Sequence, residues 1–221
     1  MKLELNASMM CADFGHLAEE VMKLQEAGVD SFHIDIMDGK FVDNFAMSLN
    51  DLSYIAKVAT VPLDVHLMIE HPRVHIEKFL NTIRKGDTVY IHPESEYHPS
   101  TTLNKIYYAG MIPGVAINPC TSLEAISDML FLARKVLVMA VDPGEVGRPY
   151  LPFVSEKIQQ LIALKEKRNF KIYIDGACNM SRIISYSRMG VDGVVLGTSS
   201  LFKNNDEYDD IISTMRNLIL I

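Results

Sequence analysis

One segment of this sequence combines side chains that bind metal ions with side chains that transfer protons. It reads His33-Ile34-Asp35-Ile36-Met37-Asp38-Gly39, so that ionisable or soft residues alternate with bulky apolar ones. Successive side chains of a β-strand point to opposite faces. A strand over this segment would therefore have one chemical face, carrying His33, Asp35 and Met37, and one packing face.

Two further segments bring the same kinds of residue. Asp64-Val65-His66-Leu67-Met68 alternates in the same way, and Tyr173-Ile174-Asp175-Gly176 ends an apolar run with an acid. A single inward-facing Asp or His is more often structural than a ligand. Four facing one interior favour a divalent cation, because burying an unpaired carboxylate costs several kcal/mol. Two imidazoles and two carboxylates suit Zn²⁺, Fe²⁺, Mn²⁺ or Co²⁺ without choosing among them, and the predicted ligands are His33, Asp35, His66 and Asp175.

The elements that would position these residues alternate along the whole chain. Short runs rich in Val and Ile predict strands over 3–10, 31–37, 62–69, 88–92, 112–117, 135–141, 171–175 and 192–197. Apolar residues three and four apart predict helices over 14–24 and 154–164, and near 50–59, 74–83, 101–109, 122–131, 179–189 and 207–219. Gly28, Gly110 and Gly190 each follow a helical run, where a left-handed C-terminal residue is expected.

Eight strands that alternate with eight helices predict a single (β/α)₈ TIM barrel, one catalytic domain over residues 1–221. The alternative is an open doubly wound sheet, but the first strand is followed by Ser8–Asp13 and not by the glycine-rich dinucleotide fingerprint. Active sites of such barrels lie at the C-terminal ends of the strands, which is where the four candidate ligands fall.

Composition excludes several classes of partner. The chain has 221 residues, 48% of them hydrophobic and 22% charged, with a net charge of −7. This charge argues against nucleic acid, while backbone N–H groups can still bind a small phosphorylated molecule. Three cysteines without CxxC spacing favour a reducing cytosol. The N-terminus does not resemble a signal peptide, and no apolar run approaches the length of a membrane span. We expect a cytoplasmic protein.

Loops at the C-terminal ends of the strands suit a phosphorylated substrate. Gly176–Asn179 and Gly197–Ser200 are small turns entering helices, as in phosphate-binding loops, although ordinary helix capping explains such turns equally well. The segment 139–149 holds two glycines between prolines, which suits a lid or else a simple connection. Met37, Met68 and Met139 would make one pocket apolar. His92, in His92-Pro93-Glu94, could reach substrate, orient a ligand or be structural.

These residues, taken in order, resemble the ribulose-phosphate 3-epimerase family over nearly the whole chain. The resemblance is carried by Ser8, by 33–39 with Phe41-Val42, by 66–68, 139–144 and 175–176, and by 197–199 with Phe202. It implies a metal-dependent isomerase of ketose phosphates that works as a homo-oligomer. It also implies that Asp35 and Asp175 are the base and the acid, and that the lid spans 144–147. The residues expected to bind substrate are Ser8, Met37, Met68, His92, Met139, Gly144, Gly147, Gly176, Gly197, Thr198 and Ser199.

Some positions depart from the pentulose-phosphate enzymes of that family. Those enzymes usually have two adjacent glycines after the acid at 175, where this chain has Gly176-Ala177. With His92-Pro93-Glu94 and 117–119, this favours the branch that epimerises D-allulose 6-phosphate to D-fructose 6-phosphate. D-ribulose 5-phosphate and D-xylulose 5-phosphate remain the alternative pair. Glu145 and Arg148 replace Phe and Gln of the usual lid.

The chemistry of epimerisation explains why two acids are wanted. Inverting a carbon beside a ketone removes its proton from one face and returns one to the other, so two groups on opposite faces are needed. A metal ion would stabilise the enediolate between the two steps. A decarboxylase of the orotidine-phosphate type would need an Asp-x-Lys-x-x-Asp run, and 64–69 lacks its Lys and last Asp. A non-catalytic sugar-phosphate barrel would be expected to lose a ligand or an acid, and none is lost.

Overall fold

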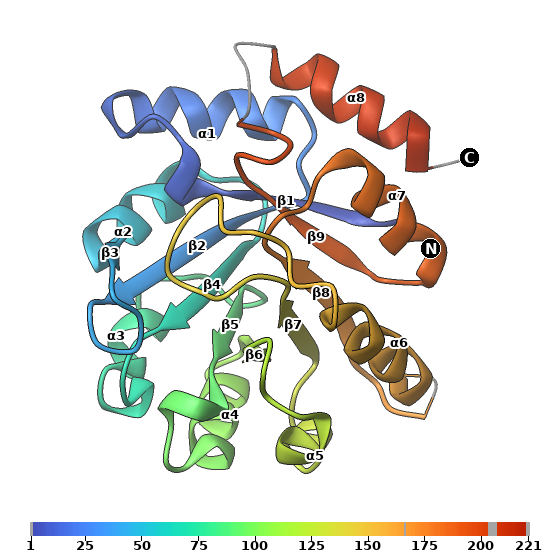
Figure 1. The fold of residues 1–221 in the computed structure, drawn as a ribbon. Coiled ribbons are helices and arrows are strands. Elements are labelled where there is room, and N and C mark those ends of the chain that lie inside the picture. The colour runs from blue at the N-terminus through green and yellow to red at the C-terminus, as the bar shows by residue number, and fades with distance from the viewer. Residues whose placement is uncertain (1, 166, 203–206, 220–221) are drawn as a thin grey trace.

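The computed structural model, which describes residues 2–165, 167–202 and 207–219, contains every predicted strand with ends within two residues of the expected ones. They are β1 (Glu4–Ser8), β2 (Ser31–Asp38), β4 (Leu63–Met68), β5 (Thr88–Ile91), β6 (Ile112–Ile117), β7 (Lys135–Met139), β8 (Lys171–Asp175) and β9 (Gly193–Leu196). Each pairs in parallel with the next, and β1 pairs with both β2 and β9, which closes the ring. The fold is therefore the predicted TIM barrel (Figure 1).

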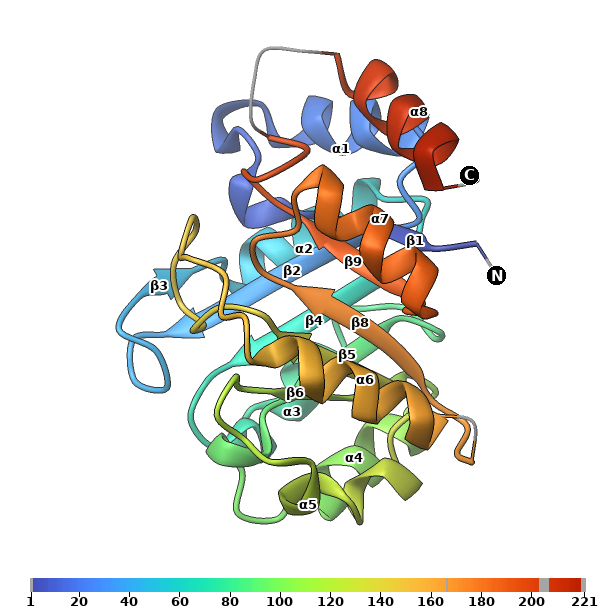
Figure 2. The ribbon, with the colours of Figure 1, turned by 45° about the vertical axis from the view of Figure 1, so that its right-hand side comes forward.

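The described residues form eight α-helices. They lie outside the barrel (Figures 1 and 2). They are α1 (Leu17–Glu26), α2 (Leu49–Val58), α3 (Ile76–Leu80), α4 (Pro99–Tyr108), α5 (Leu123–Ile126), α6 (Val154–Lys165), α7 (Met180–Met189) and α8 (Tyr208–Ile219). Gly28, Gly110 and Gly190 have φ of 90°, 89° and 91°, which confirms their left-handed positions. Among these described helices, none has the length and hydrophobicity needed to cross a membrane.

Three local features differ from the prediction. The helices near 74–83 and 122–131 are shorter, since α3 and α5 have five and four residues and 3₁₀ turns lie beside them at Pro72–Val74 and Met129–Phe131. A spacing of three or four between apolar residues is equally compatible with a short α-helix next to a 3₁₀ turn, so this spacing does not give the length of the helix. The strand β3 (Phe45–Ala46) pairs antiparallel with β2 outside the barrel. Two residues are too few to produce a recognisable alternation.

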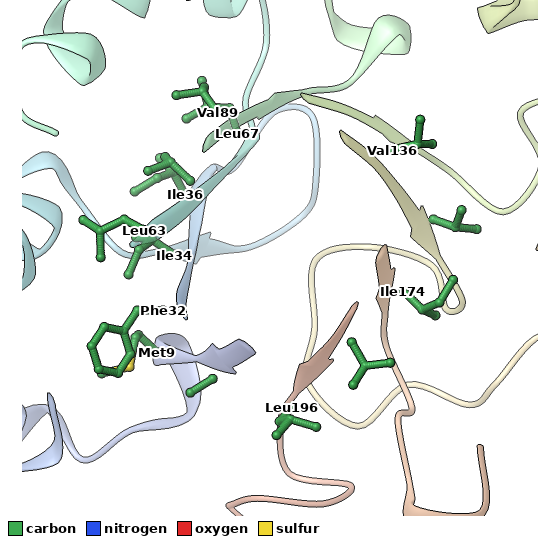
Figure 3. Close-up of a cluster of buried hydrophobic side chains, with 14 of the residues drawn as sticks. Met9, Phe32, Ile34, Ile36, Leu63, Leu67, Val89, Val136, Ile174 and Leu196 are labelled. Carbon is green, nitrogen blue, oxygen red and sulfur yellow. The ribbon is translucent and has the colours of Figure 1, made fainter. Parts of the chain in front are cut away.

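Apolar residues on alternate strand positions form the layer between strands and helices. Phe32, Ile34 and Ile36 of β2 belong to this layer, and Figure 3 shows them with similar residues of the other strands pointing outward. The intervening residues of β2, His33 and Asp35, are buried on the opposite face. The strand period has therefore placed the predicted packing face outside and the chemical face inside the barrel.

A buried ion pair lies inside the barrel toward the N-terminal ends of the strands. The Lys135 Nζ atom lies 3.0 Å from Asp64 Oδ1, and both residues are less than 10% exposed. Lys135 Nζ also lies 4.4 Å from the centre of the Tyr173 ring. This pair joins β4 to β7 across the barrel interior.

Substituting Lys135 with Met is expected to destabilise the fold by about 3–5 kcal/mol, because it leaves the Asp64 carboxylate buried without its partner. Denaturant unfolding followed by circular dichroism measures the loss. The double substitution Lys135→Met with Asp64→Leu should recover most of it, since no unpaired charge then remains. A single substitution as stable as the wild type would contradict a role for this pair in the fold.

Candidate metal and acid–base site

The four predicted ligands meet at the C-terminal end of the barrel. His33 and Asp35 lie on β2, His66 on the neighbouring β4, and Asp175 ends β8 on the other side of β1 and β9. One donor atom from each residue lies within 4.8 Å of the donor atoms of the other three. The pattern of alternation on three separate strands therefore converges on one point.

The individual distances fit a single small cation. His66 Nδ1 lies 3.1 Å from Asp35 Oδ1 and 3.8 Å from Asp175 Oδ2, while His33 Nε2 lies 3.3 Å and 3.9 Å from the same two oxygens. The two imidazole nitrogens are 3.4 Å apart. Ligands about 2.1 Å from one ion in tetrahedral directions are about 3.4 Å apart, so this donor set matches what Zn²⁺ or a similar cation requires.

The electrostatics of the cluster favour a positive charge among its donor atoms. Burial opposes protonation of His33, but Asp35 outweighs it and raises the His33 pKa to about 9. Burial likewise opposes the charge on Asp35, yet the His33 and His66 imidazoles lower its pKa. Burial and then the charge of Asp35 raise the pKa of Asp175. A bound divalent cation would supply the charge that a proton on His33 otherwise provides.

The two carboxylates of the cluster, Asp35 and Asp175, line a cavity of about 580 Å³, part of it open to solvent. Ser8 donates from its hydroxyl to Asp35 Oδ2 at 3.0 Å and so holds the carboxylate oxygen that faces away from the cluster. Twelve residues predicted to be catalytic or to bind substrate line this cavity. They are Ser8, Asp35, Met37, Met68, Met139, Gly144, Gly147, Asp175, Gly176, Gly197, Thr198 and Ser199.

His92 differs from this group, because it lies behind His66 and does not line the cavity. Its Nε2 atom is 2.8 Å from His66 Nε2, and its ring is fully buried. If the His66 Nδ1 lone pair faces the cation, the Nε2–H of His66 must donate to His92 Nε2. His92 then carries its own proton on Nδ1, which lies 3.5 Å from Glu94 Oε2. Of the predicted roles for His92, the geometry favours orienting a ligand over contacting substrate.

The pKa values of His92 and Glu94 agree with a neutral imidazole beside a charged carboxylate. Burial lowers the pKa of His92 to about 4, which keeps the ring neutral. Burial would raise the pKa of Glu94, but contacts with His92, the Thr121 hydroxyl and the Asn118 N–H together lower it to about 2. Glu94 Oε1 accepts the Asn118 N–H at 3.0 Å. A fixed carboxylate and a neutral imidazole therefore stand behind His66.

Substituting His92 with Phe is expected to weaken metal binding about 10- to 100-fold, because the His66 Nε2–H loses its acceptor. Titration calorimetry with Zn²⁺, or the visible absorption of a Co²⁺-loaded protein, measures the change. His92→Gln, which keeps an acceptor oxygen, should recover part of the affinity, and the exposed His75→Phe should have no effect. Unchanged metal affinity in His92→Phe would refute the orienting role.

The loop between β7 and α6 crosses in front of the strand ends (yellow in Figure 1). Its Gly144 and Gly147 have φ of 111° and 82°, a conformation that favours glycine. Asn44 Nδ2 donates to Gly144 O at 2.7 Å, and a Cβ atom on Gly144 would lie 3.0 Å from the Val42 Cβ. The loop is thus fixed at one end against the segment that follows β2.

The loop after β8 contains Ala177, one of the positions at which this chain departs from the family that its sequence resembles. Gly176 has φ of 97°, and a Cβ atom there would lie 2.5 Å from a Val141 methyl group, so only glycine fits. Ala177 has φ of 50°, a left-handed conformation that glycine adopts more easily. At position 177 this chain therefore has an alanine in a backbone conformation that a second glycine would adopt more easily.

Sequence reasoning did not identify four residues at the site. Met10, Cys11 and Val195 line the cavity, and Asn44 donates a hydrogen bond to Gly144 in the loop between β7 and α6. Met10 and Cys11 follow Ser8 in a 3₁₀ turn at the end of β1, so their position next to Ser8 was the available signal. Burial raises the pKa of Cys11 to about 11, so its thiol stays protonated.

Comparisons with known proteins agree with this geometry. The family model described as the ribulose-phosphate 3 epimerase family matches residues 4–202. A ribulose-phosphate 3-epimerase of Methanocaldococcus jannaschii is 36% identical over 98% of this chain and 89% of its own length. The Aquifex aeolicus enzyme of the same name is 38% identical, over 93% of this chain and 92% of its own.

Solved structures with lower identity show the fold alone. Tryptophan synthase subunit alpha from Legionella pneumophila superposes with a TM-score of 0.65 at 14% identity, over 99% of this chain and 93% of that one. Thiamine phosphate pyrophosphorylase from Pyrococcus furiosus gives 0.63 at 15% identity, over 99% and 96% of the two chains. Both comparisons agree with the barrel topology.

The relatives favour the pentulose alternative over the allulose 6-phosphate reading, because both are named for ribulose phosphate. Two of the three segments that favoured allulose 6-phosphate, 92–94 and 117–119, lie outside the lining of the cavity. Neither His92 nor Asn118 lines the cavity, so neither measures the length of a substrate there. Ala177 lines it, but with a backbone conformation that a second glycine would also adopt.

Proposed function

Because the chain belongs to the ribulose-phosphate 3-epimerase family, and is therefore an epimerase acting on sugar phosphates, we propose that it interconverts D-ribulose 5-phosphate and D-xylulose 5-phosphate. The observation that carries the reaction type is that two carboxylates, Asp35 and Asp175, line one cavity and also meet two imidazoles in a cluster that could hold a metal ion. The names of the relatives support the substrate pair.

Asp35 and Asp175 would perform the two proton transfers. One carboxylate removes the C3 proton from one face of the ketose, and the other, as a carboxylic acid, returns a proton to the opposite face. The strands β2 and β8 that carry them are separated by β1 and β9, so the two side chains approach the cavity from different directions. Ser8 donates to one Asp35 oxygen and so orients that carboxylate. The roles of the two acids exchange when the reaction runs in reverse.

The other residues predicted to bind substrate would hold the sugar phosphate and exclude water from the cavity. Met37, Met68 and Met139 supply an apolar wall. Backbone N–H groups of the loops after β8 and β9 can bind phosphate where those loops enter helices. His33, Asp35, His66 and Asp175 would hold one divalent cation, which when bound supplies positive charge where negative charge develops on the sugar.

A side-by-side exchange assay in deuterated water tests the proposal. Ribulose 5-phosphate should gain deuterium at C3 and yield xylulose 5-phosphate. Allulose 6-phosphate, which is one hydroxymethylene longer, should exchange at least about tenfold more slowly. Faster exchange on allulose 6-phosphate would overturn the substrate assignment. No C3 exchange on either sugar, in metal-loaded protein, would overturn the reaction.

A further inference from the structure

Few positively charged side chains line the cavity in which the phosphorylated substrate is proposed to bind. Four acids line the cavity: Asp35, Asp142, Glu145 and Asp175. Among the described residues that line it, Arg148 is the only lysine or arginine. Backbone N–H groups can bind phosphate but carry no formal charge. Of the described side chains that line the cavity, Arg148 is therefore the one that can offer a phosphate group a formal positive charge beside those backbone N–H groups.

Arg148 forms an ion pair with Glu145 that is partly exposed and weak enough to be replaced by another anion. Its Nη2 atom lies 3.2 Å from Glu145 Oε2, and the two side chains are 35% and 61% exposed. The pair lies within the lid loop, three residues apart, and spans the left-handed Gly147. Exposed pairs of this kind contribute little to stability. The Arg148 Nε atom, by contrast, is buried and has no hydrogen-bond partner among the described residues.

We propose that Arg148 binds the phosphate group of the substrate with its side chain and exchanges Glu145 for phosphate when substrate enters. This rests on the proposed function only in assuming a phosphorylated substrate. The guanidinium of Arg148 presents N–H groups in a planar fork that matches phosphate oxygens, and one N–H, on Nε, has no partner to lose. Gly176, Gly197, Thr198 and Ser199 line the same cavity and complete the anion site.

Glu145 has a defined part in this arrangement. Its carboxylate neutralises Arg148 in the empty cavity and competes with phosphate for the same guanidinium. Removing the charge of Glu145 should therefore strengthen phosphate binding, while removing the charge of Arg148 should weaken it. A merely structural ion pair would give the two substitutions effects of the same sign.

Inorganic phosphate binding to the metal-loaded protein, measured by titration calorimetry, tests the proposal without turnover. Arg148→Gln should raise the phosphate Kd about 10- to 100-fold, the range for a charge-assisted hydrogen bond. Arg148→Lys should fall between Arg148→Gln and wild type, and Glu145→Gln should bind more tightly than wild type. In turnover assays, Arg148→Gln should raise KM more than it lowers kcat. Lys40→Gln, an exposed charge that does not line this cavity, is the matched control for net charge.

Three results would overturn the inference. They are an unchanged phosphate Kd in Arg148→Gln, an equal loss in Lys40→Gln, or weaker binding in Glu145→Gln. Arg148-dependent phosphate binding in a protein that does not epimerise either sugar would sink the proposed function and leave this inference standing. A protein that epimerises the sugar but binds phosphate equally well without Arg148 would overturn this inference and leave the proposed function standing.

Discussion

Substituting Asp175 with Asn, or Asp35 with Asn, is expected to lower kcat by at least about 10³-fold while the protein stays folded, since loss of a general acid or base typically costs about 10²–10⁴-fold. Asparagine keeps the size of the side chain and one oxygen donor toward the cation. Unlike aspartate, the asparagine amide cannot accept or release a proton near neutral pH. Steady-state kinetics, with circular dichroism and metal content measured on the same samples, separates lost chemistry from lost structure.

The two variants should also differ in isotope exchange. A variant with one acid left can remove the C3 proton from only one epimer, and it returns a proton to the same face. Asp35→Asn and Asp175→Asn should each exchange C3 with deuterated water on a single epimer, and the epimers should be opposite. Asp43→Asn, an exposed acid beyond the same strand as Asp35, should behave as wild type. Near-normal conversion in either active-site variant would refute the two-acid mechanism.

Removing the metal is expected to abolish epimerisation and to lower the thermal midpoint of unfolding. Without a cation, four donor atoms from His33, Asp35, His66 and Asp175 face one another within 4.8 Å. A ligand present at about 100 times its Kd stabilises the native state by about 2.7 kcal/mol, so the loss should be visible by calorimetry. Dialysis against a chelator, followed by addition of single cations, measures both effects.

The pattern of recovery then identifies the effective cations. Zn²⁺, Fe²⁺, Mn²⁺ and Co²⁺ are the candidates that the donor set allows. A protein with His66→Ala should bind every one of them more weakly, which distinguishes cations bound at this cluster from cations bound elsewhere on the protein. Full activity in protein shown to be free of metal would contradict the assignment of this cluster.

The strands and the four-residue cluster were predictable because both follow from short-range periodicity. Alternation fixes which residues of β2 face inward, and the rule that parallel strands end together brings His33, His66 and Asp175 to one level. The helices α3 and α5 were less well predicted, since spacing by three and four does not distinguish a full helix from a helical turn. The two-residue β3 has no periodicity to detect.

Contacts that depend on the register between distant segments could not be read from the sequence. The Asn44–Gly144 hydrogen bond joins residues 100 positions apart, and the Lys135–Asp64 pair depends on which layer of the barrel each side chain enters. From its place at the end of a strand, His92 was expected to reach substrate, to orient a ligand or to be structural. Its actual place behind His66 follows from the neighbouring strands β4 and β5, which bring the two rings 2.8 Å apart.

X-ray absorption spectroscopy of the metal-loaded protein tests the central claim most directly. We expect one divalent ion per chain, with two imidazole nitrogens and at least two carboxylate oxygens at about 2.0–2.2 Å. The imidazole signal should fall to one ring in His66→Ala. A protein that binds no ion, or an ion whose coordination sphere contains no imidazole, would contradict the account.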